Sequence, residues 1–244
     1  LHIHRILLQR SWISVFRGRF ADAVELVAQA REYLDQWPRS SWLQYARLDD
    51  HLGNIWRADA LADMGFDGIS EPTDDFAATE ARHAASLGVT HVEPGSEAHR
   101  SAMAKLERAA ELKIPAALAV DSVRYSMLDA DSRWRWAAHV SGRMLASAFS
   151  VAWEWENTEL LSELIEYHSA RGTFAHEPLD ESSTWNAAAS TTVVADTAAE
   201  EALAAGGESV DGLTLTTLGP LPALRMDPAR TPILERYRRL AQTR

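Results

Sequence analysis

A glycine flanked by two helical patterns near the N-terminus constrains the fold of this chain more than any other feature. Gly18 interrupts a first apolar helical pattern, and a second face then follows at helical spacing, made by Phe20, Ala23, Val27 and Ala30. Small residues on such a face let a neighbouring helix approach to about 8–10 Å. The passage therefore predicts two helices packed as a hairpin, with Gly18 in the turn.

The same periodicity continues through most of the 244 residues. We expect helices over 2–17, 20–36, 41–64, 73–88, 96–112, 115–128, 132–154 and 158–171. The predicted fold class is all-α, an irregular stack of helical hairpins similar to tetratricopeptide repeats. Stacks of this kind bind other proteins, so the pattern favours an interaction scaffold over an enzyme.

Single residues add expectations for the first and third helices. Ile6, Leu7, Ile13 and Phe16 supply the apolar positions of the first helix. Gly53 lies inside the third, where glycine costs about 1 kcal/mol relative to alanine. We attribute this glycine to the close approach of a neighbouring helix.

Later helices have their own markers. Pro115 is expected in the first turn of a separate helix, where proline is tolerated. Asp129 and Asp131 resemble paired carboxylates, but their position before a helix favours capping over acid–base chemistry. Trp134 and Trp136 point about 200° apart on a helix, which favours packing on two faces over an aromatic ligand clamp.

The last expected hairpin turns at Asn157. The helix after it is predicted to bury Leu161, Leu164 and Ile165.

Composition changes after residue 172, which suggests three parts. Residues 1–172 form the expected helical domain, residues 173–228 a linker, and residues 229–244 a C-terminal helix that begins near Pro232. The linker is rich in Ala, Ser, Thr and Gly, and it contains a short helical pattern near 195–205 and a possible strand over 213–218.

Charge and cysteine content exclude several function classes. The net charge is −11, so nucleic acid and anionic membranes are not expected partners. The chain has no cysteine, which excludes disulfides and thiolate chemistry and fits a cytoplasmic location. The first residue, Leu1, is not methionine and already lies in a helical pattern, so we expect a piece of a longer protein.

No catalytic or metal-binding pattern stands out in the sequence. His2 and His4 would point apart on a helix, and no zinc-protease motif, phosphate-binding loop or Ser/His/Asp order is recognisable. We therefore predict no enzyme activity, no cofactor and no bound metal.

Candidate binding residues come from the stack hypothesis. The first helix of each pair usually lines the concave groove of such a stack, and its polar side chains then meet a protein or peptide partner. On the third and seventh expected helices these are Asn54, Arg57, His139 and Arg143. The alternative is that all four belong to ordinary solvated surface.

The C-terminal half resembles the repeat region of actinobacterial CHAT proteins, in which a tetratricopeptide-like region precedes a caspase-like protease domain. The similarity involves the segment from Trp134 to Gly172, with Glu-Leu-Ile-Glu-Tyr at 163–167, and the run Gly-Pro-Leu-Pro-Ala-Leu-Arg-Met at 219–226, followed by the helix that contains 233–237. The resemblance implies a recognition or regulatory region of a larger bacterial protein. It provides no catalytic residue, because the family's His/Cys dyad requires a cysteine.

Two other functions remain open from the sequence. The chain could be the sensor arm of a bacterial transcription regulator, which an adjacent DNA-binding or ATPase domain would indicate. It could also be an α-helical enzyme with an unrecognised acid–base site, which carboxylates or histidines converging in a closed cavity would indicate. The sequence leaves the oligomeric state open.

Overall fold

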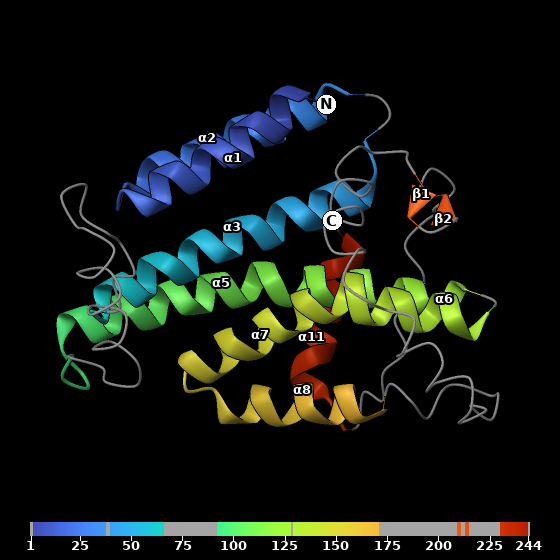
Figure 1. Cartoon of the computed structure of the whole chain (residues 1–244). Helices are drawn as coiled ribbons and strands as arrows, with labels where there is room; N and C mark the ends of the chain where they lie inside the picture. Colours follow the sequence, from blue (N-terminus) through green and yellow to red (C-terminus); the bar gives the residue numbers. More distant parts are fainter. Residues whose placement is uncertain are drawn as a thin grey trace, which may run out of the picture. The chain divides into compact units, whose positions relative to one another are not determined.

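The computed structural model describes residues 2–37, 40–65, 92–127, 129–170, 209–210, 213–214 and 230–243 (Figure 1). The described part is an all-α protein, as expected. Its principal helices are α1 (His2–Phe16), α2 (Phe20–Asp35), α3 (Trp42–Asp63), α5 (Glu97–Ser122), α6 (Ala130–Arg135), α7 (Gly142–Glu154), α8 (Thr158–Ala170) and α11 (Pro232–Thr243). One short antiparallel pair, β1 (Ser209–Val210) with β2 (Leu213–Thr214), accompanies them.

The chain divides into two compact units, which are described separately. Unit 1 comprises Leu1–Ala116 and Ser150–Asn157, and unit 2 comprises Ala117–Phe149 and Thr158–Arg244. The divisions fall inside α5 and α7. The three-part organisation expected from composition stays a prediction. The helix expected over 73–88, the helical pattern near 195–205 and the 219–226 run lie outside the described residues.

The hairpin of α1 and α2 confirms the expected N-terminal turn. Gly18 has a left-handed backbone with φ of 67°, a conformation that glycine adopts at little cost. The N–H groups of Gly18 and Arg19 donate to the carbonyls of Val15 and Ser14 at 2.9 and 2.8 Å, which closes the end of α1. The expected small-residue face is buried as well, because Ala23, Val27 and Ala30 are at most 1% exposed.

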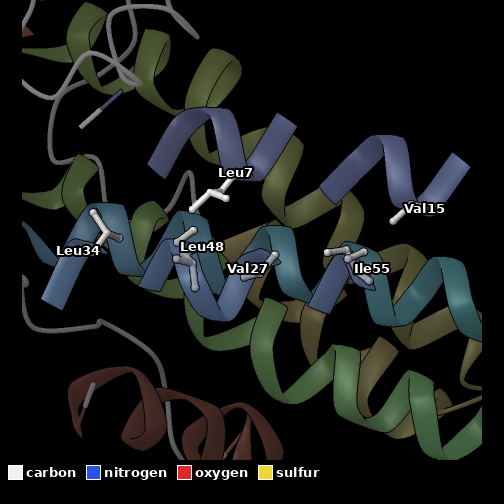
Figure 2. Close-up of a cluster of buried hydrophobic side chains, with 8 residues drawn as sticks. Leu7, Val15, Val27, Leu34, Leu48 and Ile55 are labelled. Atoms are coloured by element: carbon white, nitrogen blue, oxygen red, sulfur yellow. The ribbon is translucent and has the colours of Figure 1, made fainter. Parts of the chain in front are cut away.

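One hydrophobic core of unit 1 lies where α1, α2 and α3 meet (Figure 2). Its buried members are Leu7 and Val15 of α1, Ala23, Val27, Ala30 and Leu34 of α2, and Leu48 and Ile55 of α3. Ser41 precedes α3, and its N–H donates to Gln44 Oε1 at 2.8 Å, so a local capping interaction marks the start of the helix. The expected bounds of 41–64 are confirmed to within a residue.

The expected break at Pro115 is wrong, because α5 runs through this proline without interruption. An interior proline removes one helical hydrogen bond and costs about 3 kcal/mol. Every residue from 112 to 124 is buried, and a break there would leave several backbone groups away from water without partners. Burial by tertiary packing therefore outweighs the local preference of proline.

The helix expected over 132–154 begins two residues earlier, at Ala130, and changes its winding. Asp129 caps α6 by accepting a hydrogen bond from the Ser132 N–H at 2.7 Å, which confirms the capping interpretation for Asp129, while Asp131 lies in the first turn of α6. A π-helical segment, Trp136–Ser141, then joins α6 to α7, and its wider turn shifts which side chains face inward. Trp136 is buried and donates to the Val120 carbonyl at 2.8 Å. Trp134 is 39% exposed, so the expected packing of both tryptophans on two buried faces is wrong at Trp134.

The turn between α7 and α8 differs by one residue from the expectation. Glu156, not Asn157, has the left-handed backbone, with φ of 56°. Leu164 is buried in α8 as expected, but Ile165 is 53% exposed. The buried face of α8 instead includes a carboxylate, Glu163.

That carboxylate explains how the last helix is held. The Glu163 oxygens accept hydrogen bonds from the backbone N–H groups of Ile233 and Leu234, at 3.0 and 2.8 Å. These groups belong to the first turn of α11, whose N–H groups have no partners within the helix. Glu163 therefore caps α11 from another helix, and the expectation of a C-terminal helix from Pro232 is confirmed.

Candidate protein-binding surface

Helix α1 has apolar side chains on two sides, and only one of them packs inside unit 1. Leu7 and Val15 face the core. Three of the residues that the sequence offered for that core, Ile6, Ile13 and Phe16, are instead 55%, 49% and 64% exposed. With Ile3, which is 52% exposed, they form a surface that we call the outer face of α1.

The spacing of this outer face is regular. At about 100° per residue, Ile3, Ile6, Ile13 and Phe16 fall within roughly 140° of arc on the side away from Leu7 and Val15. Large apolar side chains that are half exposed and aligned along one helix differ from the scattered exposed residues of ordinary surfaces, and such patches mark interaction sites. A signal for this surface is present in the sequence, since the apolar residues of 2–16 are spread around the helix instead of lying on one stripe.

The polar candidates of unit 1 make contacts within the unit. The Asn54 Oδ1 accepts from Lys113 Nζ at 2.8 Å. Arg57 forms two hydrogen bonds to the Glu154 carboxylate, at 2.6 and 2.5 Å, and this pairing raises the pKa of Arg57. Both side chains thus connect α3 to neighbouring helices, and their role in binding a partner stays a prediction.

The candidates of unit 2 lie on the π-helical segment and α7. His139 is half-buried, with its ring edge-to-face against Trp134 at 5.9 Å between centroids. Arg143 is exposed, near the start of α7. The structure does not bring these two residues together with Asn54 and Arg57 in one described unit. Their role also stays a prediction.

A buried polar cluster in unit 2 is the strongest alternative site. Asp121 is fully buried and accepts hydrogen bonds from the Ser141 and Tyr167 hydroxyls, both at 2.6 Å. The Arg124 guanidinium lies 3.4 Å from the same carboxylate. Burial, and then Asp121, raises the pKa of Tyr167 well above its usual range. Both carboxylate oxygens are engaged by buried side chains, so this geometry fits a structural role in the unit.

In unit 1, a polar contact connects α1 to α3 on the side of α1 that is packed. Ser11 Oγ lies 2.6 Å from His51 Nε2, and the Trp12 ring packs edge-on against the imidazole at 5.1 Å. Burial, followed by the positive charges of Lys113 and His4, lowers the pKa of His51 to about 4. At neutral pH His51 is therefore uncharged and helps to fix α1 on α3.

Neither a candidate metal site nor a candidate membrane span is found in the part of the chain that the structure describes. In those ranges, no group of three or more His, Asp or Glu residues is placed to hold a metal ion. No helix there combines the length and apolar character that a bilayer crossing needs.

No protein-family model, curated protein or solved structure matches this chain. Its function is therefore inferred from the outer face of α1.

Proposed function

We propose that this chain is a non-catalytic protein-interaction module that binds its partner through the outer face of α1. The observation that supports the proposal is the row of four half-exposed apolar side chains, Ile3, Ile6, Ile13 and Phe16, on a helix whose opposite side is already packed. The Gly18 turn and the core of Figure 2 hold this helix on α2 and α3. The chain thus presents to a partner the exposed face of a helix that is packed on its other side.

Energies indicate a modest affinity for this surface alone. Complete burial of an Ile or Phe side chain stabilises by about 1.5–3 kcal/mol, so covering four half-exposed ones contributes roughly 3–6 kcal/mol. Association itself costs about 4–15 kcal/mol in lost freedom of movement. Polar contacts must therefore contribute binding energy in addition to the apolar ones, and the partner must carry charges that complement those on the outer face of α1.

The resemblance to CHAT proteins extends this proposal to a larger protein, in which the module recognises or restrains an attached caspase-like protease. The parent reading frame beyond Arg244 tests that link. A downstream segment with a histidine and a later cysteine, each at the end of a strand, would support it. A stop codon directly after Arg244 would contradict it.

Site-specific cross-linking tests the binding surface itself. A photo-reactive benzoylphenylalanine replaces Gln9, which is exposed between Ile6 and Ile13, and in a control it replaces Glu159, which is exposed on α8. We expect an adduct from position 9 and not from position 159, when both are made in the native host. The adduct is identified by mass spectrometry, and the purified partner must then bind the purified chain.

Two outcomes contradict the proposal. One is the same set of adducts from both positions, which indicates random collision. The other is a purified partner whose binding is unchanged when Ile6 and Ile13 are replaced by asparagine.

A further inference from the structure

Two arginines continue the spacing of the apolar row on the outer face of α1: Arg10 lies within the helix, and Arg17 is the first residue after its end. Ile3, Ile6, Arg10, Ile13 and Arg17 follow one another at steps of three, four, three and four residues. This is the spacing with which one helix meets another along a continuous seam. Arg10 and Arg17 are both exposed, and neither has an ion-pair partner among the described residues.

The charge of this region is opposite to that of the whole chain. The first 21 residues contain four arginines and no Asp or Glu, while the complete chain has a net charge of −11. The N-terminal stretch that contains the apolar row is therefore locally positive in an acidic chain. A partner segment with carboxylates opposite Arg10 and Arg17 would satisfy both features.

A second copy of the chain satisfies the apolar row but not the charges. In an antiparallel pair of α1 helices, Ile3 would lie opposite Phe16 of the other copy, and Ile6 opposite Ile13. The axis of such a pair falls between residues 9 and 10, which places the two copies of Arg10 beside each other. Like charges at a helix contact are destabilising, so self-association is disfavoured.

An anionic lipid surface matches α1 but not the remainder of the chain. Basic amphipathic helices bind membranes through both apolar and electrostatic contacts. Here an acidic protein of net charge −11 would have to approach the same surface, and its charge opposes that approach. A protein segment is the better match.

We propose that the outer face of α1 binds an amphipathic helix of another protein, with apolar residues at three–four spacing and a carboxylate opposite each of Arg10 and Arg17. This inference rests on the proposed function and specifies the partner class for the same surface. The apolar row supplies affinity, and the two arginines select an acidic helix and fix its register.

Two designed peptides test the inference. Each has three heptads with leucines at the seam positions, and they differ only in whether glutamate or lysine lies next to the seam. Fluorescence anisotropy measures their binding to the full chain. We expect the acidic peptide to bind at least about tenfold more tightly than the basic one, with a difference that shrinks in high salt.

Charge reversal supplies the decisive comparison. The variant Arg10→Glu/Arg17→Glu should bind the basic peptide more tightly than the acidic one. A control with the same change in net charge, Arg108→Glu/Arg236→Glu, alters exposed arginines on α5 and α11 and should keep the original preference. The variant Ile6→Asn/Ile13→Asn should bind neither peptide. Its circular dichroism spectrum should match that of the native chain, which shows that the variant is folded.

The failing outcomes are distinct. Equal binding of both peptides, or of neither, overturns the inference about an acidic helix, whereas the proposed function is tested separately by cross-linking and by the affinity of the purified partner. Sedimentation that shows a dimer lost in Ile6→Asn/Ile13→Asn would assign the face to a second copy. Co-sedimentation with phosphatidylglycerol vesicles, lost in the same variant, would assign it to lipid. Either result overturns the inference.

Discussion

Gly53 of α3 leaves the space that the side chain of Lys113 on α5 occupies. A Cβ atom at position 53 would lie 2.2 Å from Lys113 Cγ and 3.2 Å from the Ala109 carbonyl oxygen. Lys113 is fully buried, and its ammonium group donates to Asp50 Oδ1 at 2.5 Å and to Asn54 Oδ1 at 2.8 Å. The glycine thus permits a buried cation to connect two helices, and the expectation that Gly53 marks a close helix approach is confirmed.

Gly53→Ala should therefore destabilise the protein, although alanine is the better helix former. We expect the free energy of unfolding to fall by about 1–3 kcal/mol, because the added methyl group overpacks the contact. Urea denaturation measures the change. The added substitution Lys113→Ala should make Gly53→Ala less harmful. An increase in stability from Gly53→Ala alone would show that the space is open.

The lowered pKa of His51 predicts a loss of stability in mild acid. The unfolded chain binds a proton with the ordinary histidine pKa of 6.5, whereas the folded pKa is about 4. The unfolded state therefore binds more protons between these values, and stability falls as the pH drops from 6.5 towards 4, by at most about 3 kcal/mol. Urea denaturation at several pH values should give a shallower decline for His51→Gln. Parallel declines would contradict the assignment.

Removing the charge of Glu163 should loosen α11. Glu163→Gln keeps one acceptor but loses charge-assisted hydrogen bonds to Ile233 and Leu234, which should cost about 1–3 kcal/mol. Faster hydrogen exchange at these two amides provides a local readout. The matched control is Glu166→Gln, whose partner Arg230 is exposed at the surface, and its effect should be near zero. Equal effects of both substitutions would argue against a cap.

The Asp121 cluster should be essential to unit 2. Asp121→Asn leaves the nearby, largely buried Arg124 without a counter-charge, and breaking a buried ion pair costs about 3–5 kcal/mol. Thermal and urea denaturation should both show a large loss. Asp129→Asn is the control, since asparagine caps helices as well as aspartate does. A stable Asp121→Asn variant would show that the cluster is dispensable.

Helix boundaries were predictable wherever a local signal marks them. A turn or a cap involves Gly18, Ser41 and Asp129 directly, and Pro232 occupies the first position of α11, where proline is tolerated. The continuation of α5 through Pro115 was not predictable, because the local preference of proline is outweighed by burial that only the tertiary structure creates.

The buried faces of the later helices were harder to predict. The π-helical segment 136–141 changes the rotation of helix α7, which comes directly after it. Glu163 is buried where it accepts a hydrogen bond from the first turn of α11, 70 residues later in the chain. Interactions of this range have no signature in a local pattern.

The candidate site shows the same limit. The apolar residues of α1 are visible in the sequence, and their spacing at about 100° per residue spreads them around the helix instead of along one side. Which side packs on α2 depends on contacts between Leu7, Val15 and the rest of the core. The sequence pattern therefore indicates which residues of α1 are apolar, but not which of them are left exposed for a partner.

The central claim is that the outer face of α1 binds a protein partner, and a matched pair of affinities tests it most directly. The partner identified by cross-linking is purified, and isothermal titration calorimetry measures its affinity for the native chain, for the variant Ile6→Asn/Ile13→Asn and for the variant Ile165→Asn. Ile165 is 53% exposed on α8, close to the 55% of Ile6, so it controls for general loss of apolar surface. We predict at least about a tenfold weaker affinity for the α1 variant and an unchanged affinity for Ile165→Asn. Equal affinities of the two variants would contradict the claim.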